Sequence, residues 1–596
     1  MSIWNIKKVD LEKVYELAEE ANISLCAAKI ATGRDIYTNE HLEEYSTHST
    51  KKFHSPMLLP DIEPVLKRLN TAIDNQEKIF VWGDYDVDGI TSTAIVVTAL
   101  RSMGANLEYK VPHRMEDGYD IKLHSVDEAI EREAKLLFSV DCGIVAFETA
   151  EYAKKCNIDL IITDHHHPSD DGSLPDCIGV VNPNRDDPAY PGEKFASHAK
   201  PGFQRYPFDA LAGCGIAFKV MVALCFQRKM SVKMLSQAVL DYVALGTVAD
   251  VAPMIDENRA LVALGCDILS STDKAGIKEL LKVAGVKEVS TTSIGFALGP
   301  RINAIGRLAD SQTALDLLLE TNETRAKFIA QQLDQANKKR QKDQEVATQE
   351  AILMVNELYP NMEETKIIVI GSASWHPGLI GLVAGKVAEV FNRPALVCHI
   401  KGDGYSKGSC RSVRTFNILE ALKSEKAWAL FKKRDDGSTV CGGHAFAAGF
   451  ELKTDNLRAM SDALNEYAKD SENITDEKII DIDALLTFDD ISEKTYKEIS
   501  MLAPFGSMNP TPIFCSRRLK VVNNETSGAG KHLKLRLGND RNTNWLICNA
   551  WRRGHESELY PVNSYVDVAF TISMDEWMGR KGITLVAEDI KLSNTQ

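Results

Sequence analysis

The chain has 596 residues, more than one hydrophobic core can organise, so we expect three or four domains. Hydrophobic residues make up 44% and charged residues 26%, as in an ordinary soluble globular protein, and the absence of an apolar run of about 18 residues argues against a membrane-spanning helix. The net charge of −15 is unusual for a nucleic-acid-binding protein, but net charge says little about one groove, so it neither supports nor excludes such a substrate.

Residues 1–70 are predicted to form a polar, helical N-terminal extension. The opening segment MSIWNIKKVDLEKVYELAEEANIS is amphipathic and charged and lacks the apolar core of a signal peptide, so we expect no export. The twelve cysteines of the chain are scattered without a CxxC pair, which argues against a zinc ribbon and a disulfide framework. They suit a reducing compartment, and we expect a cytoplasmic protein.

Strands and helices alternate through residues 71–310, which is the rhythm of a doubly wound α/β domain. Three short runs in this region are rich in β-branched or aromatic residues and are bounded by glycine or proline: KIFVWGDYDVDG, LLFSVDCG and LIITDHHHP. We interpret them as buried strands of a parallel sheet. A fourth apolar run, YVALGTVADV, also ends in an acid.

Acidic or imidazole side chains follow all four runs directly. They are Asp84, Asp86, Asp88, Asp141, Asp164, His165, His166 and Asp250. In open α/β sheets the ligand crevice lies beyond the carboxyl ends of the strands, so we expect these side chains to converge. Like charges in a dry crevice push one another towards protonation, and two metal ions bridged by a shared carboxylate are the simplest compensation. The pattern therefore predicts a metal-assisted hydrolase.

The residue types also indicate which metal and which roles to expect. Oxygen ligands favour Mg²⁺ or Mn²⁺, and an imidazole from His165 shifts the preference towards Mn²⁺. Asp141 ends the middle strand, where a carboxylate that bridges two ions is expected. Asp250 is expected to close the site from a helix end or a turn, although it also suits a cap of the segment before Pro253.

Two of these segments leave alternatives open. The acidic segment Asp84–Asp88 is equally consistent with a turn that caps a helix N-terminus, where carboxylates are favoured. Three consecutive histidines cannot all face inward, so we expect His165 to be a ligand and His166 to lie nearer a substrate phosphate. Asp164 is either a ligand or a carboxylate that orients an imidazole.

Residues 311–362 are predicted to form a connecting helix, because the stretch from Glu323 to Tyr359 contains no glycine or proline and its apolar residues keep helical spacing. Its polar middle favours a solvent-bridging helix between domains over a coiled coil. Residues 363–470 repeat the strand–helix pattern and are predicted to form a second, smaller α/β domain. Residues 471–596 contain short alternating strands with polar turns, which is typical of a small barrel or sandwich.

Glycine-bounded segments in both α/β domains carry polar residues that suit phosphate binding. They are GPRINAIGR with Arg301, Asn303 and Arg307, GSCRS with Ser409 and Arg411, and GGHAFAAG with His444. We interpret each as a turn that approaches a nucleotide, and each is also consistent with an ordinary turn. Arg114, in VPHRMEDGYD, is a further phosphate candidate, with surface ion pairing as its alternative.

The C-terminal domain interleaves basic and aromatic residues. The basic residues are Arg517, Arg518, Lys520, Lys531, His532, Lys534 and Arg536, and the aromatic residues are Phe514, Trp545 and Trp551. Basic side chains that track a phosphate backbone beside aromatic stacking platforms form a single-strand-binding surface. The alternative is a solvated strand face with tryptophans in the core.

Taken in order, these segments resemble the DHH phosphoesterase superfamily, and in particular its single-strand-specific 5′→3′ DNA exonucleases. The motifs are VWGDYDVDGITST, VPHRMEDGYD, SVDCGI, TDHHHP, VNPNR, LAGCGIAFK, VALGTVADVAPM, GPRINAIGR, WHPGLIGLVAGK, GSCRS, CGGHAFAAG and LAPFGSMNP. The resemblance extends from near residue 50 to the C-terminus. Trp82 replaces a histidine that is frequent in related phosphoesterases, and Cys410 stands where glycine is usual, which leaves the geometry of that turn open.

The resemblance implies a DHH catalytic domain over 71–310, a connecting helix over 311–362, a DHH-associated domain over 363–470 and a nucleic-acid-binding OB-fold over 471–596. The positions that match metal ligands are Asp86, Asp88, Asp141, His165 and Asp250, with Asp84 and His166 as ligands or substrate contacts. The positions that match contacts to a 5′-terminal phosphate are Arg114, Ser409 and Arg411. The positions that match active-site residues facing the DNA are Arg301, Asn303 and His444.

The implied activity is two-metal hydrolysis of single-stranded DNA with Mn²⁺ or Mg²⁺, proceeding 5′→3′ and releasing 5′-mononucleotides in DNA repair and recombination. The implied partners are single-stranded DNA, single-strand-binding protein and a repair helicase, and we expect a monomer without membrane association. One alternative is a phosphoesterase for short oligonucleotides, cyclic dinucleotides or pyrophosphate, against which the chain length and the basic C-terminal domain argue. The other is an inactive scaffold, against which the complete acid and histidine set argues.

Overall fold

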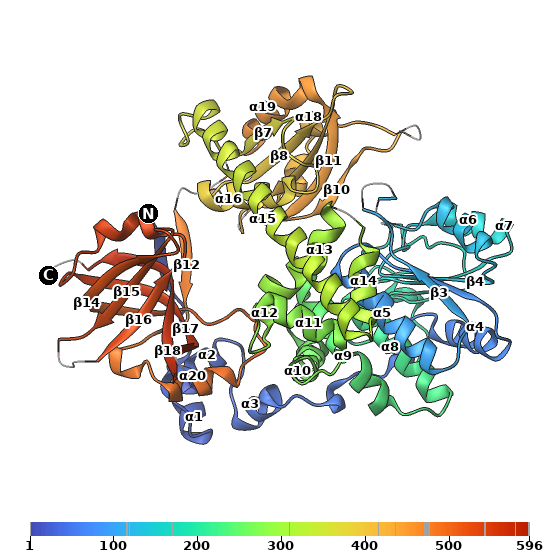
Figure 1. Cartoon of the computed structure of the whole chain (residues 1–596), viewed down its shortest axis with the longest axis horizontal. Helices are drawn as coiled ribbons and strands as arrows, with labels where there is room; N and C mark the ends of the chain where they lie inside the picture. Colours follow the sequence, from blue (N-terminus) through green and yellow to red (C-terminus); the bar gives the residue numbers. More distant parts are fainter. Residues whose placement is uncertain are drawn as a thin grey trace. The chain divides into compact units, whose positions relative to one another are not determined.

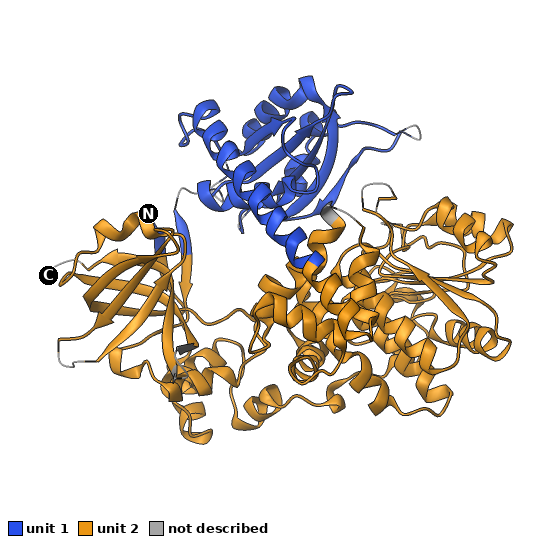
Figure 2. Ribbon diagram, viewed as in Figure 1, with its two compact units in different colours: residues 1–3, 307–309, 332–479 blue, residues 4–306, 310–331, 480–596 orange. Residues whose placement is uncertain are grey.

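The computed structural model of the chain (Figure 1) describes residues 2–114, 117–118, 120–169, 171–308, 310–414, 416–434, 437–469, 471, 474, 477–540, 544–577 and 580–593. The chain forms two compact units, which Figure 2 shows in different colours. The smaller unit comprises residues 1–3, 307–309 and 332–479, and the larger unit comprises residues 4–306, 310–331 and 480–596. None of the helices in the described ranges combines the length and the hydropathy that a membrane crossing requires.

A five-stranded parallel sheet organises the first half of the larger unit. Its order is β3 (Leu107–Lys110), β2 (Ile79–Trp82), β4 (Leu136–Val140), β5 (Asp159–Thr163) and β6 (Gly179–Val181). Strands β2 and β4 are buried along their whole length, as expected where helices cover a parallel sheet. The predicted parallel sheet and its three buried strands are confirmed.

Helices surround this sheet and then continue the chain. Those in contact with the strands are α4 (Ile62–Asp74), α5 (Val87–Ser102), α6 (Leu123–Glu131), α7 (Phe147–Lys155) and α8 (Gly213–Gln227). The fourth apolar run lies in a helix, α9 (Val232–Ala249), which packs against α5 and α8. The later helices are α10 (Asp256–Ser270), α11 (Ala275–Ala284), α12 (Thr291–Ser293), the π-helical turn η4 (Ile294–Leu298), α13 (Gly299–Leu308) and α14 (Gln312–Leu319).

The segment GPRINAIGR forms helix α13, so its interpretation as a turn was wrong. The π-helical turn η4 runs directly into α13, so the chain is already helical where it reaches Gly299 and Pro300, the first two residues of α13. Proline is tolerated in the first turn because little of the hydrogen-bond ladder depends on its missing N–H. Glycine signals alone did not distinguish a turn from a helix start.

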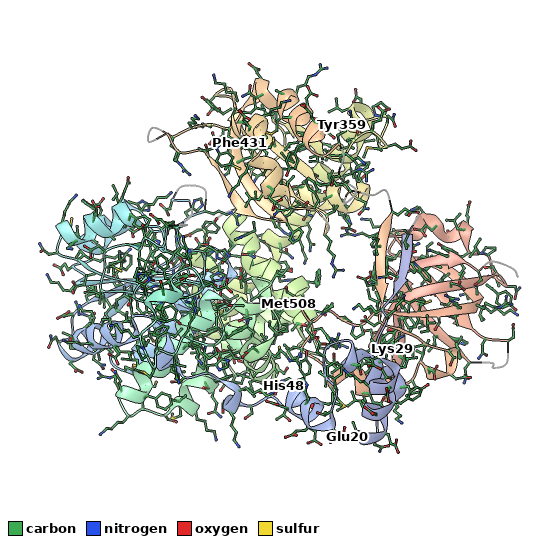
Figure 3. All side chains as sticks on the ribbon, turned by 180° about the vertical axis from the view of Figure 1, so that it is seen from behind. Glu20, Lys29, His48, Tyr359, Phe431 and Met508 are labelled. Atoms are coloured by element: carbon green, nitrogen blue, oxygen red, sulfur yellow. The ribbon has the colours of Figure 1, made fainter. Side chains whose placement is uncertain are left out.

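The predicted long helix is α15 (Glu323–Leu358), and it passes from the larger unit into the smaller one. The smaller unit contains a mixed sheet in the order β10 (Cys441–His444), β11 (Ala447–Lys453), β9 (Tyr405–Arg411), β8 (Ala395–Ile400) and β7 (Ile368–Ser372). Its helices after α15 are α16 (Ile380–Phe391), α17 (Ile418–Leu422), α18 (Glu425–Trp428) and α19 (Leu457–Tyr467). Phe431, labelled in Figure 3, belongs to one hydrophobic core of this unit. Tyr359, also labelled there, donates a hydrogen bond from its hydroxyl to the carbonyl of Val369 at 2.9 Å.

The C-terminal part forms a closed barrel, which confirms the predicted all-β domain. Its strands follow the order β13 (Ala484–Leu485), β14 (Phe514–Ser527), β15 (His532–Gly538), β16 (Trp545–Ala550), β18 (Arg580–Leu592) and β17 (Tyr565–Trp577). A further pairing of β14 with β17 closes the sheet on itself. Helix α20 (Glu493–Ser500) precedes the long strands.

The N-terminal residues pack onto this barrel. The chain begins with a strand, β1 (Ser2–Ile6), paired with β12 (Lys478–Ile482), and not with a helix. Helices α1 (Leu11–Glu20) and α2 (Leu25–Thr32) share a hydrophobic core with the barrel, in which Leu17 and Ile30 belong to the same cluster as Leu533. Helix α3 (Asn39–Ser46) and the short turns η1 (Thr50–Lys52) and η2 (Pro56–Leu58) lead from there to α4. The bounds of the five domains given above stay predictions.

Candidate metal centre and nucleic-acid-binding residues

The acids and histidines that follow β2, β4, β5 and α9 come together in the larger unit. Strands β2, β4 and β5 are neighbours in the parallel sheet, so the residues beyond their carboxyl ends share one edge. The described residues include three groups that could hold a cation, and within each group the ligand atoms lie within 4.8 Å of one another. The groups are Asp84, Asp86 and Asp141; Asp88, His165 and Asp250; and Asp141, His165 and His166. Every residue predicted to bind metal belongs to at least one group.

The loop after β2 both caps a helix and presents acids to the site. The Asp86 carboxylate caps α5 and accepts from the N–H groups of Asp88 at 2.9 Å and Gly89 at 3.2 Å. The Asp88 carboxylate is buried and accepts from the N–H groups of Gly213 at 2.7 Å and Cys214 at 2.9 Å, the first two residues of α8. A helix N-terminus favours a carboxylate, so the N-terminus of α8 orients the Asp88 side chain. The helix-cap alternative is therefore correct for Asp86 and compatible with the metal interpretation.

Asp141 lies at the centre of the site in a strained backbone conformation. Its φ of 63° is in the left-handed region, which non-glycine residues seldom adopt and which is often retained at functional sites. Its N–H donates to the carbonyl of Thr163 at 2.8 Å, and its Oδ1 lies 3.3 Å from Nε2 of His165. This oxygen has no hydrogen-bond partner within the described residues although it is buried. A carboxylate held in this way is available for a cation.

Asp164 holds the two histidines and belongs to none of the three groups. It is fully buried, and one carboxylate oxygen accepts from the backbone N–H groups of His165 at 2.8 Å and His166 at 3.1 Å and pairs with Nδ1 of His166 at 2.7 Å. The other oxygen accepts from the N–H of Ile144 at 3.0 Å. These contacts favour the orienting role over direct ligation. Nε2 of His165 is free to face Asp88 at 3.8 Å and Asp250 at 3.9 Å.

Several acids of the site have raised pKa values, which bound cations would lower. Burial raises the pKa of Asp84 and that of Asp141 well above the usual range, and neighbouring carboxylates add to both shifts. Burial, followed by the charges of Asp88 and Asp86, raises the pKa of Asp250 to about 8. Without cations these acids would be partly protonated, and bound cations would keep them ionised.

The residues present fit two divalent cations. The buried Oδ1 atoms of Asp84 and Asp141 have no hydrogen-bond partner in the described chain, and a metal would satisfy both. The donor set is rich in carboxylate oxygens with one or two imidazole nitrogens, which suits Mg²⁺ or Mn²⁺. Asp141 belongs to two of the three groups, as expected for a carboxylate that lies between neighbouring ions.

Gly213 has a role at this site that the sequence interpretation missed. A Cβ at this position would lie 2.3 Å from Oδ1 of Asp141, so only glycine leaves room for the carboxylate. Asn182 and Asn184 were missed as well: their side-chain amides donate to the carbonyls of His166 at 2.8 Å and His165 at 2.5 Å. The signal was the polar VNPN segment directly after the short run IGVV, which repeats the strand-end pattern.

Replacing Gly213 with alanine is expected to lower the rate of hydrolysis about 10- to 100-fold, as for changes that misplace a metal ligand. The added methyl group would displace the Asp141 carboxylate, while the backbone at the start of α8 accepts alanine without strain. Gly215→Ala is the matched control, since its Cβ meets first the side chain of Leu211, at 3.2 Å. Equal metal-dependent rates for the two variants would contradict the prediction, and thermal melting checks that both are folded.

The candidates for phosphate contacts in the larger unit lie beside the same loop. The Arg114 guanidinium lies 4.6 Å from the ring centroid of Tyr85, the residue between Asp84 and Asp86. Helix α13 approaches this loop at Gly306, whose Cβ position is 3.4 Å from the Tyr85 carbonyl. Arg114 therefore packs on the loop that carries Asp84 and Asp86, and its contact with a phosphate stays a prediction.

Helix α13 separates the Arg-Asn-Arg residues that were expected to clamp together. Two helical residues at i and i+2 point about 200° apart, so Arg301 and Asn303 face in different directions. Both are half-buried, and Arg301 donates to the carbonyl of Ala297 at 2.8 Å. The side chain of Arg307 lies outside the described residues. A single clamp formed by all three residues is not supported by this helix.

In the smaller unit, Ser409, Arg411 and His444 share one face of the mixed sheet. The segment GSCRS is part of strand β9, so the expected turn was wrong, and Cys410 takes a regular strand position with its side chain buried in a core. Arg411 pairs with Ala447, and Ala447 pairs with His444. Residues that pair across neighbouring strands point to the same face of the sheet. Arg411 and His444 lie two strands apart, which corresponds to about 10 Å. These three residues form a compact polar set within their own unit.

The barrel presents some of the expected aromatic residues and buries another. Trp545 and Trp551 are 44% and 57% exposed, so they are not core residues. Arg536 lies 4.6 Å from the centroid of the Trp545 ring, and His532 packs edge-on against Trp551 at 5.0 Å. Phe514 is only 1% exposed and belongs to the barrel core, so it cannot act as the predicted stacking platform.

Three family models match the chain: the DHH family N-terminal domain at residues 78–247, the DHHA1 domain at 364–470 and the RecJ OB domain at 482–589. Two similar proteins are named single-stranded-DNA-specific exonuclease RecJ. The one from Bacillus subtilis is 34% identical over 600 residues, covering 100% of this chain and 71% of the relative. The one from Escherichia coli is 31% identical over 557 residues, covering 89% of this chain and 90% of the relative.

Solved structures show the same similarity. The crystal structure of RecJ in complex with Mn²⁺ from Thermus thermophilus matches with a TM-score of 0.77 and 26% identity, covering 99% of this chain and 80% of that chain. The crystal structure of exonuclease RecJ bound to manganese matches with a TM-score of 0.55 and 30% identity, covering 71% of this chain and 97% of that chain.

Proposed function

The chain belongs to the RecJ family of single-stranded-DNA-specific exonucleases, and we propose that it hydrolyses single-stranded DNA stepwise from the 5′ end, releasing 5′-mononucleotides. It is a metal-dependent exonuclease with Mn²⁺ or Mg²⁺ as cofactor. The observation that carries the proposal is the cluster of acids and histidines beyond β2, β4 and β5, in which buried carboxylate oxygens have no hydrogen-bond partner among the described residues. Such a cluster suits hydrolysis better than binding alone.

The residues that would hold two divalent cations are Asp84, Asp86, Asp88, Asp141, His165 and Asp250. Bound cations supply Lewis-acid polarisation of the phosphodiester and lower the pKa of a water nucleophile. Asp141 belongs to two donor groups, and its carboxylate could be shared between the ions, whereas the single lone pair of the His165 imidazole would bind one ion. The α8 N-terminus holds the Asp88 carboxylate, and Asp164 orients His165, so the ligands are positioned before substrate binds.

The remaining site residues are proposed to hold the DNA. His166, paired with Asp164, and Arg114, which packs over Tyr85, would place hydrogen-bond donors next to the scissile phosphate. The residues proposed to contact the 5′-terminal phosphate are Arg114, Ser409 and Arg411. The residues proposed to face the strand from the active site are Arg301, Asn303, Arg307 and His444. Exposed Trp545 and Trp551 on the barrel offer stacking surfaces for bases.

We propose the biological setting on the same basis. The enzyme acts as a monomer in DNA repair and recombination, with single-strand-binding protein and a repair helicase as partners. A cytoplasmic location fits the twelve cysteines, all of which are free thiols. Membership of the family is what supports these proposals.

Digestion of single strands labelled at the 5′ or the 3′ end tests the reaction, its polarity and the metal together. With Mn²⁺ or Mg²⁺, the 5′ label is expected to appear at once as a mononucleotide, while the 3′-labelled strand shortens progressively. A chelator should stop both reactions because the carboxylates alone cannot activate water. Release of the 3′ label first, or activity in chelator, would refute the proposal.

Two other outcomes correspond to the alternatives. Cleavage of dinucleotides without degradation of long strands would indicate a small-substrate phosphoesterase. Binding of strands without release of nucleotides under any metal would indicate a scaffold. Duplex DNA with blunt ends serves as the control, and a single-strand-specific enzyme should leave it intact.

A further inference from the structure

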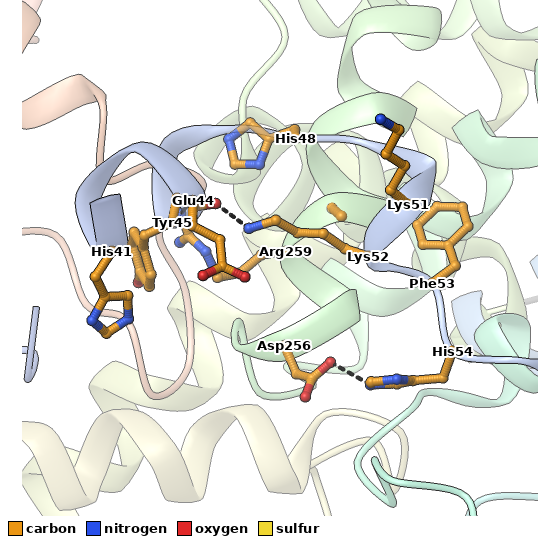
Figure 4. A pocket seen from close by; sticks show the side chains of 11 residues that line it. His41, Glu44, Tyr45, His48, Lys51, Lys52, Phe53, His54, Asp256 and Arg259 are labelled. Carbon is orange, nitrogen blue, oxygen red and sulfur yellow. Dashed lines mark hydrogen bonds and ion pairs between the residues drawn. The ribbon is translucent and has the colours of Figure 1, made fainter. Parts of the chain in front are cut away.

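A cavity of about 540 Å³ lies in the larger unit, apart from the metal centre (Figure 4). Helix α3, the turn η1 with the residues around it, and the start of α10 form its walls. The side chains that line it are His41, Glu44, Tyr45, His48, Lys51, Lys52, Phe53, His54, Asp256, Arg259 and Ala260. None of them belongs to the proposed metal ligands, and no role follows for them from the reaction described above.

Three cations line this cavity without an acidic partner. Neither Lys51 nor Lys52 nor Arg259 forms an ion pair with a carboxylate among the described residues, although the chain carries a net charge of −15. Lys52 donates instead to the backbone carbonyl of Glu44. The lining holds two acids, Glu44 and Asp256, and Asp256 pairs with Nε2 of His54 at 2.8 Å, so three cations face two carboxylates.

Backbone carbonyls and Tyr45 hold the Arg259 guanidinium, and no carboxylate among the described residues pairs with it. Arg259 is 5% exposed, and its guanidinium donates to the carbonyls of Leu502, Ala503 and Pro504 at 3.1, 2.9 and 3.2 Å. The same group lies 3.7 Å from the centroid of the Tyr45 ring. Burial lowers the pKa of Arg259 to about 10, which leaves it protonated at neutral pH. Carbonyl oxygens orient a guanidinium but do not neutralise it, so its field extends into the cavity.

The other lining residues suit a nucleotide better than an isolated anion. In Figure 4, the Lys52 side chain extends across the cavity, with the rings of His41, Tyr45, His48 and Phe53 around it. Imidazole and ammonium groups donate hydrogen bonds to phosphate oxygens, and aromatic faces stack on bases. Lys51 is exposed, and its ammonium group forms no hydrogen bond or ion pair with the described residues.

We propose that this cavity binds a backbone phosphate of single-stranded DNA at a distance from the catalytic centre, through Lys51, Lys52 and the field of Arg259. The inference rests on the proposed function. The catalytic residue Asp250 and the cavity residue Asp256 are six residues apart in the chain, so their Cα atoms are separated by at most about 20 Å. A strand of about six nucleotides spans that distance even at the duplex rise of 3.4 Å, so longer substrates can reach both sites.

The test is the affinity of the full chain for a fluorescent single strand of about 30 nucleotides, measured in chelator at several salt concentrations. Lys51→Glu/Lys52→Glu is expected to weaken binding at least about tenfold, as for the loss of charged hydrogen bonds. The slope of log affinity against log salt should fall by about 0.7, since one phosphate contact is lost and each contributes about 0.7 for a single strand. Lys51→Arg/Lys52→Arg should keep the wild-type affinity because it keeps both charges.

The matched control is Lys8→Glu/Lys233→Glu, which makes the same change in net charge at two exposed lysines outside the cavity. An equal loss of affinity in both double variants would overturn the proposal, because it would reflect net charge alone. Calorimetry with dAMP and with inorganic phosphate tests whether the cavity binds a free nucleotide or a free phosphate instead of the strand. If Lys51→Glu/Lys52→Glu loses dAMP binding but keeps the wild-type affinity for the strand, the proposal is also overturned. Strand degradation by the wild-type enzyme with Mn²⁺ reports separately on the proposed function.

Discussion

Replacing Asp141 with alanine is expected to lower the rate of DNA hydrolysis by about 10³-fold or more while leaving the affinity for single-stranded DNA within about twofold. Changes to residues that merely orient a metal ligand already cost about 10- to 100-fold. Asp141 would be a ligand itself, and it belongs to two of the three donor groups. Removing its carboxylate therefore disturbs both ions at once, whereas the surfaces that bind the strand stay intact.

Asp141→Asn is the sharper variant of this experiment. Residue 141 has a φ of 63°, and asparagine tolerates the left-handed region better than alanine does, so the amide isolates the loss of charge from backbone strain. Asp171→Ala is the matched control, because Asp171 is an exposed acid that lies in none of the donor groups. Wild-type turnover by either Asp141 variant in saturating Mn²⁺ would rule out the shared-ligand role.

Replacing Lys219 with methionine is expected to destabilise the protein by about 3–5 kcal/mol, because it leaves a carboxylate buried without its cation. Lys219 and Glu257 are 1% and 0% exposed, and Nζ lies 2.9 Å from Oε2. Glu257 also accepts from the hydroxyl of Tyr206 and from the N–H of His54, so it is fixed in place and cannot turn towards solvent. A chemical denaturation curve measures the loss of stability.

A double variant and an exposed pair make this prediction specific. Lys219→Met/Glu257→Gln removes both charges and is expected to recover most of the lost stability, since replacing both partners of a buried pair is often close to neutral. Lys154→Met breaks an exposed pair between Lys154 and Asp176, whose side chains are 68% and 71% accessible, and should leave the denaturation curve almost unchanged. Equal effects of Lys219→Met and Lys154→Met would contradict the buried-charge argument.

The predicted set of metal-site residues came from a local rule that holds well in parallel sheets. Short apolar runs predicted β2, β4 and β5, and the polar residue after each run had to lie at the same sheet edge. Asp84, Asp141 and His165 could therefore be placed without a structure. Their grouping within 4.8 Å agrees with that placement.

The phosphate candidates were harder to place because glycine has more than one structural role. Glycines near Arg301 suggested a turn, but a preceding π-helical turn carried the chain into α13. Near Arg411 the same signal marked strand β9, where Gly408 leaves space for the ring of Phe450. Glycine permits a turn, a helix start or a close contact, and neighbours outside the segment decide which occurs.

The sequence by itself determined the parallel sheet, the all-β character of the C-terminal domain, the long helix α15 and the acids at the strand ends, because each depends on patterns within a few residues of the chain. Only the tertiary structure decided how those acids are held. The N–H of Gly213 reaches Asp88 across 125 residues, Asp141 adopts a left-handed conformation, and Arg259 binds carbonyls more than 240 residues away. Such contacts depend on the packing of distant segments against one another, which no local pattern of residues encodes.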